Sequence, residues 1–132
     1  MTDAPLTDCR NDQFFDRINL DEVLLSEAQV CGGEGLIRFG FLSQEGQSSG
    51  PCRLTALVEI PPGSSLGRHL HGPDEEVFYL VLKGQGVMWP GGEEFPVRAG
   101  DLIRNPPSGE HGFQSLGPDT LRIFVFQVSV NP

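Results

Sequence analysis

The chain has 132 residues, of which 38% are hydrophobic and 20% charged, a composition typical of one folded domain that excludes wholesale disorder. Its formal net charge of −9 makes nucleic acid and anionic membrane surfaces poor partners. No apolar stretch approaches the roughly 20 residues that span a bilayer, and the acidic N-terminus does not resemble a secretory signal, so a cytoplasmic location is expected.

The first part of the chain is expected to form an N-terminal arm over residues 1–33, ahead of a β domain over residues 34–132. The first 34 residues hold eight acids and two arginines, so most of the excess negative charge lies in this arm. Residues 1–13 are polar and are predicted to be mobile. Residues 17–30 mix helix and strand signals, and a strand with a short turn is one interpretation of them.

From Gly35 onward the sequence predicts short strands separated by Gly- and Pro-rich turns, with no long helical pattern. The alternation in residues 53–60 places four apolar side chains on one face, those of Leu54, Ala56, Val58 and Ile60. This pattern favours an all-β fold, an antiparallel barrel or sandwich. Further strands are expected at residues 36–42, 77–82, 87–89, 93–98, 102–105, 111–115 and 121–130.

The cysteines give no sign of a thiolate metal site or a redox motif. The chain has three of them, Cys9, Cys31 and Cys52, and no Cys-x-x-Cys pair. Reduced cysteines are therefore expected, although the sequence leaves a disulfide between Cys31 and Cys52 open.

The three histidines indicate a metal site. His69 and His71 are two residues apart, so on a strand both imidazoles point to the same side. A turn follows, and Glu75 and Glu76 begin the next strand, while His111 follows a later turn. Three imidazoles with one carboxylate suit a divalent transition metal such as Fe, Mn, Ni, Co or Zn. The alternative is that these are ordinary polar residues beside turns.

Residues 63–84 resemble the first signature of the cupin superfamily: a glycine, five residues, His-x-His, three or four residues, a glutamate, six residues and a glycine. Gly63, His69, His71 and Glu76 match this signature. Seven residues rather than six separate Glu76 from the final glycine, which a β-bulge would absorb, and this leaves Glu75 as an alternative ligand.

The choice between the two glutamates fixes which side of the strand faces inward. If Glu76 faces inward, Phe78 does so too, whereas Glu75 would place Tyr79 inward. Of the two, Glu76 is the preferred ligand.

The later turn resembles the second cupin signature. Gly100, Pro106 and His111 match its spacing, while Ser108 and Ser115 replace its glycine and asparagine. The resemblance implies a double-stranded β-helix barrel of the cupin or jelly-roll type and a homodimer. It also implies one divalent metal ion, with four ligands, His69, His71, Glu76 and His111.

The resemblance further implies a small-molecule substrate held inside the barrel. Glu76 is the candidate catalytic base, and Arg104 could clamp a substrate carboxylate if it points inward. The expected activity is that of a non-haem Fe(II) dioxygenase or of a Lewis-acid isomerase, cyclase or lyase. The alternative is a ligand-binding or sensor protein with a structural metal. The candidate pocket residues are Phe78, Met88, Arg104, Phe113, Phe124 and Phe126.

Overall fold

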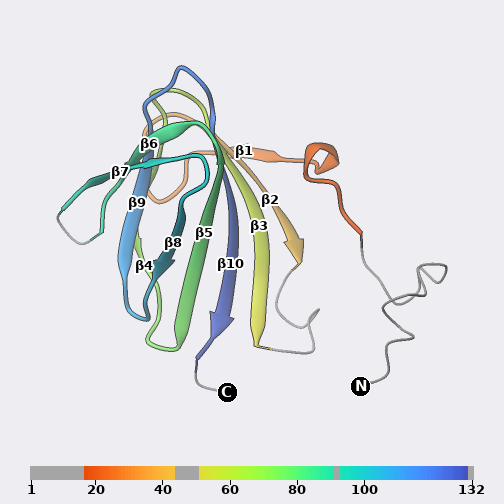
Figure 1. Ribbon diagram of the computed structural model, residues 1–132, viewed down its shortest axis with the longest axis vertical. Coiled ribbons are helices and arrows are strands. Elements are labelled where there is room, and N and C mark those ends of the chain that lie inside the picture. Colours follow the sequence, from red (N-terminus) through yellow and green to blue (C-terminus); the bar gives the residue numbers. More distant parts are fainter. Residues whose placement is uncertain (1–16, 44–50, 91–92, 131–132) are drawn as a thin grey trace.

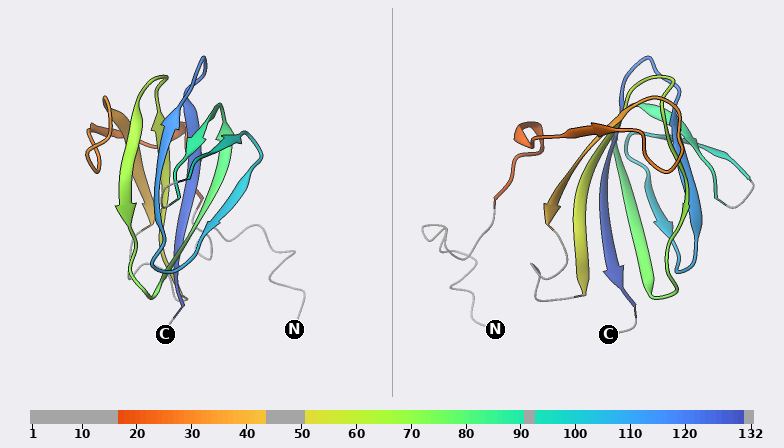
Figure 2. Two further views of the ribbon diagram at one scale, coloured as in Figure 1. Left: turned by 90° about the vertical axis from the view of Figure 1, so that its left-hand side faces the viewer. Right: turned by 180° about the vertical axis from the view of Figure 1, so that it is seen from behind.

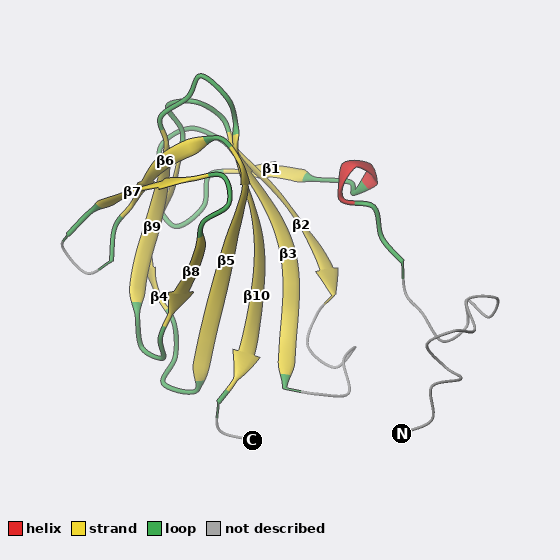
Figure 3. Cartoon of the chain, viewed as in Figure 1, coloured by secondary structure: helices red, strands yellow, loops and turns green. Residues whose placement is uncertain are grey.

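The computed structural model describes residues 17–43, 51–90 and 93–130. These residues form ten strands and one 3-10 turn at Leu20–Glu22. The strands are β1 (Ser26–Ala28), β2 (Ile37–Ser43), β3 (Cys52–Ile60), β4 (Ser65–Leu70), β5 (Glu75–Lys83), β6 (Gln85–Met88), β7 (Phe95–Arg98), β8 (Leu102–Asn105), β9 (Glu110–Ser115) and β10 (Leu121–Ser129). The described residues contain no α-helix, and therefore no helix that could cross a membrane (Figure 3).

The strands build two antiparallel sheets that face each other (Figure 1). The six-stranded sheet has the order β1-β2-β3-β10-β5-β8, and the four-stranded sheet has the order β4-β9-β6-β7. The predicted all-β double-stranded β-helix is confirmed, and each strand expected beyond residue 35 is present with ends shifted by at most two residues. The alternating apolar pattern produces these strands because each can bury one face between the sheets.

The core lies between the two sheets, and strands of both sheets contribute side chains to it. In β3, Val58 and Ile60 face this core, as the alternation predicted. Leu57 faces the opposite side of the same strand, yet its exposed fraction is 0%. A residue on the outer face of a sheet is buried only if another segment covers it.

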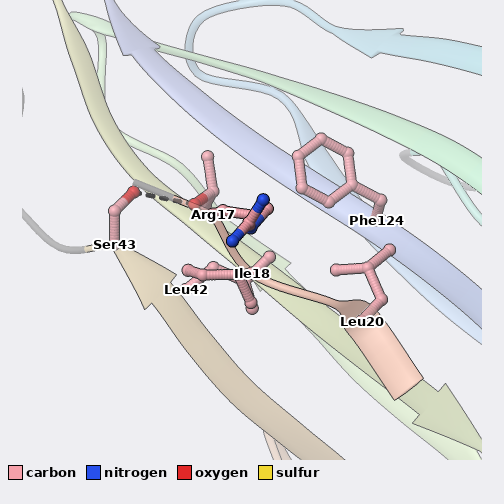
Figure 4. Close-up of a pocket in the computed structure, with 7 residues that line it drawn as sticks. Arg17, Ile18, Leu20, Leu42, Ser43 and Phe124 are labelled. Carbon is pink, nitrogen blue, oxygen red and sulfur yellow. Dashed lines mark hydrogen bonds between the residues drawn. The ribbon is translucent and has the colours of Figure 1, made fainter. Parts of the chain in front are cut away.

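The N-terminal arm provides that cover. Leu57 pairs with Gly40 of β2, and a Cβ at Gly40 would press against residues 23–25, so the arm lies directly over this part of the outer face. Leu20 and Phe124 line an open hollow of about 640 Å³ nearby (Figure 4). The described part of the arm is therefore packed onto the barrel.

The arm also connects the two sheets. β1 pairs with β2 at the edge of the six-stranded sheet, and residues 30–34 then run along β4 of the four-stranded sheet (Figure 2). The Gly67 N–H donates to the Val30 carbonyl at 3.2 Å, and the Ser65 N–H donates to the Glu34 carbonyl at 2.9 Å. Cys31, in this segment, and Cys52 are free thiols, so the disulfide that the sequence left open is not formed.

Candidate metal centre

The three histidines meet inside the barrel. His69 lies in β4 and pairs in register with His111 of β9, while His71 follows the end of β4 directly. The ring centroids are 4.1 Å apart for His69 and His111 and 4.9 Å apart for His71 and His111. One ring nitrogen from each residue lies within 4.8 Å of the other two, so the expected convergence of the three imidazoles is confirmed.

Local contacts fix the orientation of the imidazoles. The Gly67 carbonyl lies 3.0 Å from Nδ1 of His69, which leaves Nε2 of that ring free. Nδ1 of His71 faces Glu75 Oε1 at 3.6 Å, and Nε2 of His71 is buried with no hydrogen-bond partner in the described part of the chain. A buried polar atom without a partner is costly, and a metal ion would satisfy it. The residues present therefore fit a divalent metal.

The surroundings keep two of these rings neutral. Burial lowers the pKa of His111 to about 2, and the neighbouring His69 and His71 add to this effect. Burial followed by proximity to His69 also lowers the pKa of His71, although Glu75 acts in the opposite direction. Metal binding requires the neutral form of imidazole, so these two rings are already in the state that a metal would need.

We expect the metal-free protein to lose stability as the pH falls below about 6.5, the ordinary pKa of histidine. The unfolded chain then binds a proton at residue 111 that the folded chain does not, so the free energy of unfolding falls with the pH. The slope from this residue is at most about 1.4 kcal/mol per pH unit. Urea unfolding of chelator-treated wild type and His111→Asn, compared between about pH 7 and pH 5, measures it. Equal slopes for the two proteins would contradict the assignment.

The inward side of β5 differs from the expected one. Tyr79 is 3% exposed, and its hydroxyl is in hydrogen-bond contact with Nε2 of His111. The register between β5 and β10 shifts at Leu82, so the extra residue forms an irregularity beyond Val81 and the strand before it keeps Tyr79 inward. The expectation that Phe78 faces inward is therefore wrong. Burial raises the pKa of Tyr79, with a further contribution from the Cys31 thiol.

The same alternation separates the two glutamates. Glu76 lies on the outer face of β5 and forms an ion pair with Arg104 of β8, whose side chain is 57% exposed. Arg104 therefore points outward, not inward as a clamp on a substrate carboxylate would require. The structure does not bring Glu76 to the histidines, and its position gives no support to a role as ligand or base. Glu75 faces inward, accepting hydrogen bonds from the Gly72 N–H and Gln127 Nε2, each at 3.0 Å.

The six candidate pocket residues divide between the core and the outer face of the six-stranded sheet. Met88 and Phe113 are buried in the core between the sheets, at 2% and 0% exposure. Phe78, Phe124 and Phe126 instead form an aromatic group on the outer face, where Phe78 and Phe126 stack with ring centroids 4.9 Å apart. These three phenylalanines and the outward Arg104 do not line the barrel interior, because they lie on the same side of the sheet as Glu76.

Sequence reasoning missed the role of Tyr79 beside His111 and that of the Gly67 carbonyl beside His69. The strand alternation contained the signal for Tyr79, since it follows Glu75 by four residues. No sequence signal marks a backbone carbonyl as a partner of a histidine.

Comparison with known proteins identifies the class. The family model described as a cupin domain matches residues 56–127, and the chain belongs to the cupin family. An oxalate-binding protein of Thermotoga maritima is 33% identical over 90 residues, which cover 68% of this chain and 74% of that protein. A dimethylsulfoniopropionate lyase of Ruegeria pomeroyi is 33% identical over 88 residues, covering 67% of this chain but only 56% of the lyase.

Solved structures agree on the fold. The crystal structure of a predicted oxalate decarboxylase from Thermotoga maritima has a TM-score of 0.80 at 26% identity, covering 86% of this chain and 99% of that chain. The cupin domain of Cnp3 from Schizosaccharomyces pombe has a TM-score of 0.69 at 16% identity, covering 84% of this chain and 72% of that chain. The second similarity concerns the fold alone.

Proposed function

We propose that this protein binds one divalent transition metal through His69, His71 and His111 and uses it to bind a small carboxylate. The observation that carries the proposal is the buried Nε2 of His71, which has no hydrogen-bond partner in the described chain and lies in a cluster of three imidazoles. A borderline metal held by imidazoles keeps further positions open, and such an ion supplies Lewis acidity and a binding point for anionic oxygen.

Two relatives support a carboxylate as the ligand. One is named for oxalate, and the other for dimethylsulfoniopropionate, and both compounds carry a carboxylate group. In this chain the buried Phe113 lies beside His111, with ring centroids 6.0 Å apart, and Met88 pairs with Phe113, so the site has an apolar side. The formal charge of −9 disfavours an anion elsewhere on the protein, so a carboxylate is expected to bind only when the metal is present.

Calorimetric titration with oxalate tests this proposal. The wild type loaded with Mn(II) or Zn(II) is expected to bind one oxalate per chain, and the chelator-treated protein to bind none. The His111→Ala protein, exposed to the same metal, serves as the matched control and is also expected to bind none. Equal oxalate binding with and without metal, or no binding by the loaded wild type, would overturn the proposal.

Catalysis is the second candidate, and the similarity to a lyase favours it. Incubating the metal-loaded protein with oxalate or dimethylsulfoniopropionate and following substrate loss by NMR separates catalysis from binding. An oxygen electrode tests the dioxygenase chemistry expected from the sequence. Dioxygenase and isomerase activities, the homodimer and the cytoplasmic location all stay predictions of the sequence.

A further inference from the structure

The tyrosine at the histidine cluster has no role in the cupin signatures or in the function proposed above. Tyr79 is the single tyrosine of the chain. It lies on the inward side of β5 and is almost fully buried, between His111 and Phe113, whose rings lie 4.8 and 4.9 Å from its own. A buried phenol needs a polar partner, and within the described chain its hydroxyl has only His111.

The phenol oxygen faces the edge of the His111 ring that carries both nitrogens. It is in contact with Nε2 and lies 3.4 Å from Nδ1. These nitrogens are the atoms through which His111 would hold a metal, and the hydroxyl already stands beside them. The oxygen of Tyr79 is thus placed within reach of a metal that the histidines hold.

The carboxylates do not compete for this position. Glu76 is on the outer face with Arg104, and neither it nor Glu75 belongs to the group of ligand atoms that lie within 4.8 Å of one another. Glu75 faces Nδ1 of His71, the nitrogen on the far side of the ring from the buried Nε2. Its two oxygens already accept hydrogen bonds from the Gly72 N–H and from Gln127.

We propose that Tyr79 Oη is the fourth protein ligand of the metal, and that Glu75 is a positioning residue that holds His71 by Nδ1. This inference rests on the metal binding proposed above. A buried phenolate is unfavourable alone but is stabilised beside a cation, so coordination releases the phenol proton to solvent. A carboxylate behind a ligating histidine orients the ring and fixes which nitrogen is free. The ligand set becomes three histidines and a tyrosine, in place of the three histidines and a glutamate that the sequence predicted.

Loading the protein with Fe(III) tests the proposal, because a phenolate bound to ferric iron gives an intense visible charge-transfer absorption. The chain has one tyrosine, so the band and its tyrosinate resonance Raman lines can arise only from Tyr79. The wild type is expected to show the band at one iron per chain. Tyr79→Phe is expected to lack the band and to bind metal about tenfold more weakly or worse. Glu75→Gln, the matched carboxylate control, is expected to keep the band.

The possible results are distinct. Iron-loaded wild type without the band, or Tyr79→Phe that retains it, overturns the tyrosine ligand and leaves the metal site in place. Wild type that takes up no Fe(III), Mn(II) or Zn(II) overturns the proposed function and this inference together. If Tyr79→Phe does not fold, the Raman spectrum of the wild type decides alone.

Discussion

The His111→Ala protein is expected to lose its bound metal and to remain folded. His111 is 0% exposed and lies within β9, in register with His69 of β4, so it is a fixed side chain whose loss no mobile side chain can replace. Groups outside the coordination shell already contribute about 10–100-fold to metal affinity, so the loss of a ligand should exceed about 100-fold. The fold should persist because burial of apolar strands dominates its stability. Elemental analysis of the purified protein and circular dichroism measure the two effects.

Glu76→Gln is the matched control for this experiment. The cupin signature favours Glu76 as a ligand, whereas the structure places it on the outer face with Arg104. The Glu76→Gln protein should therefore keep one metal per chain. A metal-free Glu76→Gln protein would reinstate the prediction from sequence, and a His111→Ala protein that melts or retains full metal would contradict the site described here.

Replacing Leu57 by alanine is expected to lower the free energy of unfolding by about 2–5 kcal/mol, the range for buried leucine. Leu57 is 0% exposed although it faces away from the core between the sheets, because residues 23–25 cover the neighbouring Gly40. The truncation leaves a cavity between the arm and the sheet. Urea unfolding monitored by fluorescence of Trp89 gives the value.

Leu102→Ala provides the comparison. Leu102 also lies on the outer face of the six-stranded sheet, on β8, but its exposed fraction is 63%. Its truncation should change the free energy of unfolding by less than about 0.5 kcal/mol. Equal effects of the two substitutions would mean that the arm does not cover Leu57 in solution.

The strands and the histidine cluster were predictable because their signals are local. Apolar alternation and turn residues place strand ends to within two residues, and the spacing of His69 and His71 places both on one side of a strand. Which side chains of β5 face inward was not predictable from local signals. Counted back from Gly84, one extra residue at Leu82 changes which side chains of β5 are expected to face inward. Its position depends on the pairing with β10.

The burial of Leu57 and the outward position of three of the four candidate pocket phenylalanines could not be predicted from the sequence either. Aromatic residues look alike whether they face the core or the outer surface of a sheet that another segment covers in part. The contacts that decide this, such as the one between Gly40 and residues 23–25, join parts of the chain with no shared sequence signal.

Gly67 joins the arm to the metal site. Its N–H holds the Val30 carbonyl and its own carbonyl holds His69 Nδ1, while a side chain at this position would overlap the Cys31 carbonyl. Proteolytic removal of the chain as far as Val30 would therefore disturb Gly67, two residues before the proposed ligand His69. The metal content of a preparation would then report whether the N-terminal arm is intact, even when its circular dichroism spectrum still shows the β structure.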